Sequence, residues 1–193
     1  MKKLESNLKN MVIVLTLIAC ISSLSLTWVN KITQTAIQAS KDNAEISAIR
    51  EVLPVDFDNN PFEEKTEIGE DNLELYPGRT DGKITSFAIK SFSNLGFGGR
   101  IDIIVGFYLD GTINTYHVVS HKETPGLGTK AWESPFIDQF QDFSLKKQNI
   151  DIKQDGGDID AVTSATISSR AITDAIKRAY ETFVKFNTGS NDE

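Results

Sequence analysis

A run of 19 uncharged residues, Met11 to Val29, constrains this chain more than any other feature of its sequence. The run is about as long as the hydrocarbon core of a bilayer is thick, so we expect residues 11–29 to form a transmembrane helix. Three lysines and a single glutamate precede it, which predicts that residues 1–10 stay in the cytoplasm. The rest of the chain is therefore expected outside the cytoplasm, in a single-pass protein of the cytoplasmic (inner) membrane.

Two other interpretations compete for the apolar run. A cleaved signal peptide normally ends at an A-x-A-like site, and no such site follows this run. Residues 17–20, LIAC, loosely resemble the lipobox of a lipoprotein signal, but the apolar run continues for nine residues beyond Cys20. The uncleaved anchor is the interpretation that the pattern favours.

Charge and cysteine content exclude several classes of function. The net charge is −7 and no stripe of lysine or arginine is present, so nucleic acid is not an expected partner. The single cysteine, Cys20, provides no disulfide framework, CxxC redox pair or cysteine-ligated metal site. His117 and His121 would lie about 13 Å apart on one face of a strand, too far to share an ion, so we assign no metal site.

The hydrophobic patterns beyond the anchor predict an α+β fold, in which helices flank an antiparallel sheet. We expect a helix over 31–53, strands over 73–76, 83–92, 101–109 and 112–120, a short helix over 133–141, a short strand over 150–152 and a long amphipathic helix over 164–186. Asp110-Gly111 is a strong hairpin signal between two of these strands. The expected parts are a cytoplasmic N-terminus (1–10), a transmembrane helix (11–29), a helical connector with an acidic loop (30–70), a folded domain (71–187) and a flexible tail (188–193).

Two glycine-containing segments are candidates for ligand binding. GFGGR, residues 96–100, precedes a strand and matches no phosphate-loop pattern, so its glycines are expected at a bulge or a close backbone approach. HKETPGLG, residues 121–128, contains the rigid turn Thr124-Pro125-Gly126. Two interpretations stay open for it: a purely structural loop, or a ligand-facing loop that presents polar groups and backbone donors to a planar ring.

DAVTSATISS, residues 160–169, places an unusual number of hydroxyls at the start of the last predicted helix. Helix capping explains only one or two of them. A helix N-terminus with small side chains is an anion site, and hydroxyls add donors without bulk. A hydrolase is weakly supported, since no nucleophile elbow or Ser–His–Asp order accompanies the hydroxyls.

These segments together resemble those of a known family. Asp160-x-x-Thr163-Ser164-Ala165-Thr166-x-Ser168 resembles the D-x-x-[ST]-G-A-T-x-[ST] flavinylation motif of FMN-binding domains. HKETPGLG resembles a second signature, in the form found in the RnfG family, the G subunits of ion-translocating electron transport complexes. The order of anchor, GFGG segment, HKETPGLG and threonine motif also matches that family, over nearly the whole chain.

The resemblance implies that residues 71–187 are an FMN-binding domain, in which FMN is attached to Thr166 through its phosphate by a flavin transferase that uses FAD. Asp160 would serve the transferase reaction or its metal, and no catalytic residue is assigned. The other expected cofactor-binding residues are Thr163, Ser164, Ala165, Ser168, Glu123, Thr124, Gly126, Leu127 and Gly128. Ser164 stands where the family usually has glycine. If that position required a positive φ, serine would cost about 1 kcal/mol or more, but we interpret the position as requiring only a small side chain for the approach of the transferase.

The function that the resemblance implies is a membrane-anchored flavoprotein subunit of an Rnf-type complex, which couples electron flow between ferredoxin and NAD to ion movement. The subunit would relay electrons and would not be catalytic alone; its partners would be the other membrane subunits and the flavin transferase. Two alternatives stay open: the C subunit of the sodium-translocating NADH:quinone reductase, and an anchored binding or assembly module without flavin.

Overall fold

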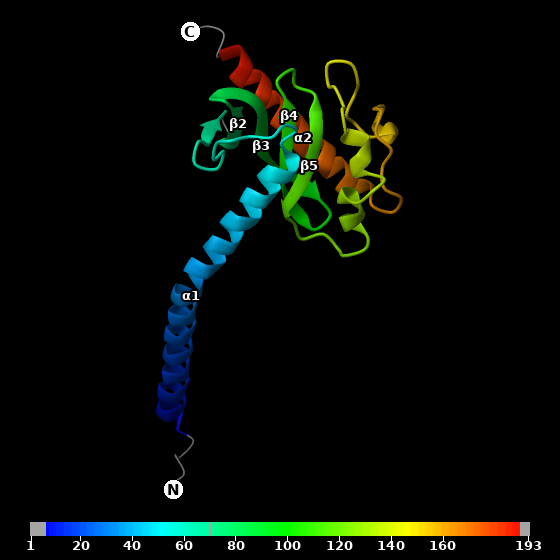
Figure 1. Cartoon of the computed structure of the whole chain (residues 1–193). Helices are drawn as coiled ribbons and strands as arrows, with labels where there is room; N and C mark the ends of the chain where they lie inside the picture. The colour runs from blue at the N-terminus through cyan, green and yellow to red at the C-terminus, as the bar shows by residue number, and fades with distance from the viewer. Residues whose placement is uncertain (1–6, 70, 190–193) are drawn as a thin grey trace. The chain divides into compact units, whose positions relative to one another are not determined.

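The computed structural model describes residues 7–69 and 71–189. Along these residues the elements are α1 (Leu8–Val52), β1 (Thr66–Ile68), β2 (Leu73–Thr80), β3 (Lys83–Gly96), β4 (Gly99–Tyr108), β5 (Ile113–Ser120), the short 3₁₀ helices η1 (Gly128–Trp132), η2 (Ile137–Phe140) and η3 (Lys153–Asp155), and α2 (Thr166–Gly189) (Figure 1). The chain divides into two compact units, with the boundary between Asn43 and Ala44. Most of the predicted cytoplasmic segment (1–10) and of the predicted flexible tail (188–193) lies outside the described residues.

The first unit, Met1–Asn43, contains the apolar part of α1. A window of 18 residues in this helix has a mean hydropathy of 2.3 and is 0% buried within the protein, so the helix is long and apolar enough to cross a membrane. The hydroxyl groups of Thr27 and Thr33 donate to backbone carbonyls one turn earlier, so neither needs a partner outside the helix. The helices predicted over 11–29 and 31–53 are one continuous helix, which ends at Val52 because Pro54 disfavours a helical residue before it.

The five strands form one antiparallel sheet in the order β1-β2-β3-β4-β5, so each strand pairs with its neighbour in sequence. The turn between β4 and β5 contains the expected Asp110-Gly111 pair. Gly111 has a φ of +87°, and the Asp110 carboxylate accepts a hydrogen bond of 2.8 Å from the Thr112 amide. The predicted fold class, α+β with an antiparallel sheet flanked by helices, is confirmed.

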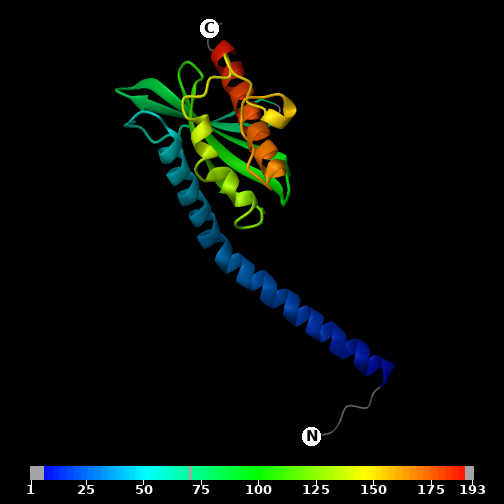
Figure 2. The same cartoon turned by 90° about the vertical axis from the view of Figure 1, so that its right-hand side faces the viewer.

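Helix α2 covers one face of this sheet (Figures 1 and 2). Ala171, Ala175 and Ala179 are fully buried, and these small residues let the helix approach the strands closely. The Ser91 hydroxyl of β3 donates to the Ala175 carbonyl at 2.8 Å, which fixes the helix along the strand. Phe183 packs on the ring of Phe107, with centroids 5.4 Å apart. The main core therefore lies between α2 and the sheet, and it sets where α2 begins.

The last turns of α1, from Ala44 onward, pack on the opposite face of the sheet. Ala48, Ile49 and Val52 form a second core cluster there with Tyr76, Ala88 and Ile104. The compact unit thus begins at Ala44, earlier than residue 71, where the sequence pattern places the start of the domain.

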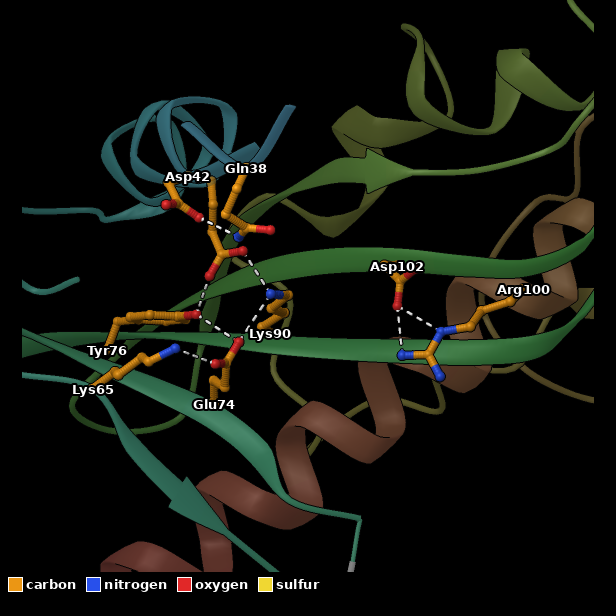
Figure 3. A network of polar contacts seen from close by, with 9 residues as sticks. Gln38, Asp42, Lys65, Glu74, Tyr76, Lys90, Arg100 and Asp102 are labelled. Carbon is orange, nitrogen blue, oxygen red and sulfur yellow. Dashed lines mark hydrogen bonds and ion pairs between the residues drawn. The ribbon is translucent and has the colours of Figure 1, made fainter. Parts of the chain in front are cut away.

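A polar network lies beside this second cluster (Figure 3). The buried Tyr76 hydroxyl donates to the Glu45 carboxylate and lies 2.9 Å from Glu74. The ammonium of Lys90 is 2.5 Å from Glu45 and 2.9 Å from Glu74, and Lys65 is 2.5 Å from the other Glu74 oxygen. The network joins the end of α1 to β2 and β3.

Three local predictions were wrong. The helix expected over 133–141 is a turn over 133–136 followed by the short 3₁₀ helix η2, because Pro135 disfavours a helical conformation at the residue before it. The strand expected over 150–152 is reduced to one isolated bridge between Ile152 and Ile159. The acidic loop contains the short strand β1, which pairs with β2 through its backbone.

Candidate functional site

The three sequence segments singled out above all contribute residues to one pocket of about 360 Å³. The first turn of α2 and the turn before it form one wall, and the loop between β5 and η1 forms another. The lining residues are Phe97, Glu123, Thr124, Leu127, Gly128, Ser164, Ala165, Thr166, Ile167 and Ser168. The structure therefore brings together eight of the predicted site residues, whereas Thr163, Gly126 and Asp160 lie outside the lining.

The start of α2 presents free backbone donors to this pocket. Within residues 7–69 and 71–189, the amides of Thr166, Ile167 and Ser168 have no backbone acceptor, and the first paired amide is that of Ser169, which donates to the Ala165 carbonyl at 3.0 Å. Unpaired amides and the helix dipole make the first turn attractive to an anion. A phosphate at this position would meet several donors.

The five hydroxyl side chains of the motif differ in their hydrogen-bond partners. Ser169 is fully buried; it accepts the Val162 amide at 3.0 Å and donates to the Ala165 carbonyl at 3.1 Å. Ser168 is also buried and donates to the Glu123 carboxylate at 2.8 Å. These two serines hold the local structure. In the described part of the chain, the remaining hydroxyls, Thr163, Ser164 and Thr166, have no side-chain hydrogen bond.

These three hydroxyl side chains also differ in where they lie. Ser164 and Thr166 line the pocket, and Thr166 is the first residue of α2. Thr163 instead lines a neighbouring cleft of about 460 Å³. Thr166 therefore combines a hydroxyl that no described side chain engages, a place in the pocket and adjacent free amides.

A tight turn leads into α2, and Ser164 occupies a strained position in it. The Ala165 amide donates to the Val162 carbonyl at 3.0 Å, and Ser164 has a φ of +67°. A positive φ at the third residue of such a turn favours glycine. Our interpretation that this position requires only a small side chain is wrong, because the backbone conformation itself explains the family's preference for glycine.

The loop before η1 supplies a second wall. The Leu127 amide donates to the Thr124 carbonyl at 3.2 Å, and Gly126 takes a φ of +76° in this turn. The Gly126 amide, expected to face a ligand, instead donates to the Thr129 hydroxyl at 2.8 Å. Leu127, between the two glycines, lines the pocket and is largely accessible. The loop thus contributes an apolar side chain to the pocket, and the Gly126 amide is not available to a ligand.

Glu123 connects three segments around the pocket. One carboxylate oxygen accepts the Gly98 amide at 2.9 Å and the other accepts the Ser168 hydroxyl at 2.8 Å. A Cβ on Gly128 would lie 2.3 Å from the carboxylate, and one on Gly98 would lie 2.0 Å from the Lys122 carbonyl. The expected close backbone approach at GFGG is confirmed.

Asp160 lies beside the pocket and outside it. Its carboxylate is exposed and forms an ion pair of 2.7 Å with Lys153. The side-chain amide of Gln139 holds the Asp160 backbone with two hydrogen bonds, of 3.0 Å to its carbonyl and 2.7 Å from its amide. Asp160 and Thr163 share the neighbouring cleft, so this end of the motif faces away from the pocket.

Sequence reasoning missed two pocket residues. Phe97 is 72% exposed at the tip of the β3–β4 hairpin, and Ile167 is 46% exposed in the first turn of α2. The helical spacing predicts that Ile167 belongs to the buried apolar stripe, but its side chain is exposed and lines the pocket. An aromatic residue flanked by glycines, as in GFGG, was the available signal for Phe97.

The two histidines are separate from the pocket lining. His117 on β5 pairs with Glu51 at 2.7 Å, and the ring of His121 lies against Trp132 with centroids 4.6 Å apart. Both contacts are structural ones, between neighbouring elements of the domain.

Comparisons with known proteins agree with this geometry. Residues 96–181 match the FMN-binding domain family. The G subunit of the ion-translocating oxidoreductase complex of Vibrio atlanticus (strain LGP32) is 33% identical over 181 residues, which cover 88% of this chain and 87% of the relative. The G subunit of the Na(+)-translocating ferredoxin:NAD(+) oxidoreductase complex of Acetobacterium woodii is 28% identical and covers 89% of each chain. The crystal structure of the C subunit of Na(+)-translocating NADH-quinone reductase from Parabacteroides distasonis has the same fold, with a TM-score of 0.56, 15% identity and coverage of 79% of this chain and 96% of that one.

Proposed function

The chain belongs to the family of the G subunits of ion-translocating oxidoreductase complexes, and from this premise we propose that it carries FMN in the pocket at the start of α2, bound covalently through its phosphate to Thr166. The resemblance to the RnfG family is confirmed by the relatives. The observation that carries the choice of residue is that Thr166, the acceptor position in the register of the motif, is the first residue of α2 and lines the pocket beside free amides, with no side-chain partner among the described residues.

The donor set at the start of α2 fits the phosphate of FMN. The amides of Thr166, Ile167 and Ser168 supply hydrogen bonds, and the dipole of a helix that begins at Thr166 favours negative charge. The Ser164 hydroxyl adds a further donor on the same wall.

The other walls fit the flavin ring. Phe97, Leu127 and Ile167 give apolar contact surface for the ring. Bound FMN supplies the redox chemistry, in which it accepts and passes on electrons. The residues of the chain hold the ring, exclude water from part of it and set the electrostatic field around it.

Attachment by a flavin transferase with FAD as donor balances as a phosphoryl transfer. The Thr166 oxygen forms a bond to the FMN phosphorus, the bond to the bridging pyrophosphate oxygen breaks, and AMP leaves. The hydroxyl proton passes to the transferase. The exposed Asp160 carboxylate lies next to Thr163 on the outer surface, where a transferase can reach it.

Replacing single hydroxyls tests this assignment. With the transferase co-expressed, Thr166→Ala should remove all covalent flavin, measured as in-gel fluorescence of the denatured protein. The free energy of unfolding should change by about 1 kcal/mol at most. Thr163→Ala and Ser168→Ala should retain some covalent flavin. Mass spectrometry of the peptide containing residues 154–170 identifies the site, and an FMN adduct on any other residue refutes the assignment. A wild-type chain without covalent flavin would favour a binding module.

In the proposed function this protein is a single-pass membrane component of an Rnf-type complex that couples ferredoxin and NAD to ion movement. The relatives' names and the single apolar helix support the proposal. The lysines before Met11 support an N-terminus in the cytoplasm. A periplasm-specific reporter fused after Glu193 should be active, and activity of a cytoplasm-specific reporter at the same position would contradict the orientation.

A further inference from the structure

Glu123 is a buried carboxylate, and no cationic side chain of residues 7–69 and 71–189 pairs with it. Its exposed fraction is 5%, although it lines the pocket. Among the described residues, no lysine, arginine or histidine side-chain nitrogen lies within 4.0 Å of its oxygens. Buried charges in proteins are usually paired, because a low-dielectric environment stabilises them poorly. An unpaired carboxylate at the wall of a ligand pocket therefore requires an explanation beyond packing.

The surroundings of Glu123 are built to hold an acceptor. Two donors, the Gly98 amide and the Ser168 hydroxyl, each meet a different carboxylate oxygen. Gly96 and Gly128 leave the space for it, since a Cβ on either would lie 2.7 Å or 2.3 Å from a carboxylate oxygen. Both donors are neutral, so they stabilise the negative charge without cancelling its field.

We propose that the negative charge of Glu123 lowers the midpoint potential of the flavin in this pocket. The inference rests on the proposed function, because it concerns the same pocket. Electrons added to the flavin bring negative charge next to a carboxylate that is shielded from solvent and lacks a counter-ion. Such a charge is felt strongly inside a protein. Glu123 thereby favours the oxidised flavin and makes the reduced flavin a better electron donor.

The surroundings of Glu123 allow its charge and its hydrogen bonds to be separated. In Glu123→Gln the amide oxygen can still accept the Gly98 amide, and the amide nitrogen can donate to the Ser168 oxygen, because a hydroxyl is both donor and acceptor. This variant removes the charge and keeps both contacts. Ser168→Ala removes one contact and keeps the charge. Glu133→Gln removes an exposed carboxylate that lies outside the pocket lining and serves as the matched control.

The test is spectroelectrochemical titration of the full-length, flavin-loaded chain in detergent. Glu123→Gln should shift the midpoint potential in the positive direction, so that the ratio of reduced to oxidised flavin at a fixed potential rises about tenfold. Ser168→Ala should lower the unfolding midpoint of the chain with a much smaller change in potential, and Glu133→Gln should match the wild type. An unchanged potential in Glu123→Gln overturns the proposal, as does an equal shift in Ser168→Ala.

Failure of the proposed attachment gives a different result. In that case the wild-type chain shows no in-gel fluorescence, and the titration is made with free FMN added to two chains, Thr166→Ala alone and Thr166→Ala combined with Glu123→Gln. A positive shift in the double variant relative to the single one supports the role of Glu123 even without covalent attachment. A chain that neither attaches nor binds FMN overturns both proposals.

Discussion

The backbone oxygen of Val52, at the end of α1, lies against Gly106 in β4: a Cβ on Gly106 would stand 1.8 Å from it. The Asn114 side-chain amide donates to the same oxygen at 2.9 Å. The helix end is therefore seated directly on the backbone of the sheet, and any side chain at residue 106 must push it away.

Gly106→Ala should lower the free energy of unfolding by about 2–3 kcal/mol, because backbone against a new methyl group cannot relax cheaply. Denaturant titration of the chain in detergent measures this. Gly82→Ala is the control: its Cβ would meet nothing within 4 Å, and only its φ of +74° opposes a side chain, at a cost of about 1 kcal/mol. Equal losses in the two variants would contradict the close contact.

Ser164→Gly should stabilise the chain by a few tenths to about 1 kcal/mol, because glycine takes a φ of +67° without steric cost. Ser164→Ala keeps the Cβ and should bring no such gain, which separates backbone strain from loss of the hydroxyl. Thermal unfolding of the flavin-free variants makes the comparison. Stabilisation by alanine equal to that by glycine would show that strain is absent at this position.

Glu74 should make stability depend on pH in the acid range. Burial raises the pKa of Glu74, but hydrogen bonds from Lys65, Lys90 and Tyr76 outweigh it and lower the pKa from 4.5 to about 2. A carboxylate with a lowered pKa stabilises the fold above its unfolded-state pKa, and this stability is lost as the pH falls from about 4.5 towards 2. The contribution at neutral pH is about 2 kcal/mol, less than the full shift implies because solvent screens part of the network.

The free energy of unfolding, measured from pH 7 to pH 2, should therefore be lower for Glu74→Gln than for the wild type at pH 7. It should also fall less steeply with decreasing pH. Glu67→Gln removes an exposed carboxylate on the neighbouring strand and should keep the wild-type slope. If both variants have the wild-type slope, the Glu74 network does not contribute to the acid sensitivity.

The two glycines of the loop should respond differently. Gly128→Ala places a methyl group within 2.3 Å of the Glu123 carboxylate and 2.9 Å of the Ser168 hydroxyl, so it should alter the visible spectrum of the flavin or reduce flavin content. Gly126→Ala meets open space and is opposed only by its φ of +76°, so it should cost about 1 kcal/mol of stability and leave the spectrum unchanged. A spectral change confined to Gly126→Ala would contradict this placement of the pocket.

The parts of the fold that were predictable from the sequence are those with strong local patterns. The alternation around Asp110-Gly111 identified the β4–β5 hairpin, and the apolar spacing of Ala171, Ala175 and Ala179 identified α2. The wrong predictions concern elements stabilised by distant partners. Phe136 and Phe140 are held in turns by their packing in the core. Strand β1 has only three residues, too few for a side-chain pattern, and it forms through backbone pairing with β2.

Some features of the site were likewise predictable from the sequence and others were not. The family resemblance, which rests on motif register and on order along the chain, was sufficient to predict that the loop 121–128 and residues 164–168 contribute to one site. The roles of individual hydroxyls were not predictable, because they depend on contacts across the fold: Ser168 is bound to Glu123, 45 residues earlier in the chain. The strain at Ser164 arises from the turn that precedes α2, and the glycine that the family usually has at this position was the signal for it.

The end of α1 packs on the sheet, so a water-soluble fragment of this chain must keep the residues from Ala44 onward. Cleavage between the apolar stretch and Ala44 leaves both faces of the sheet covered. A shorter fragment beginning at residue 71 would uncover Tyr76, Ala88 and Ile104 and leave Lys90 without Glu45. Such a fragment is expected to aggregate through its exposed sheet face, whereas one beginning a few residues before Ala44 is expected to stay monomeric.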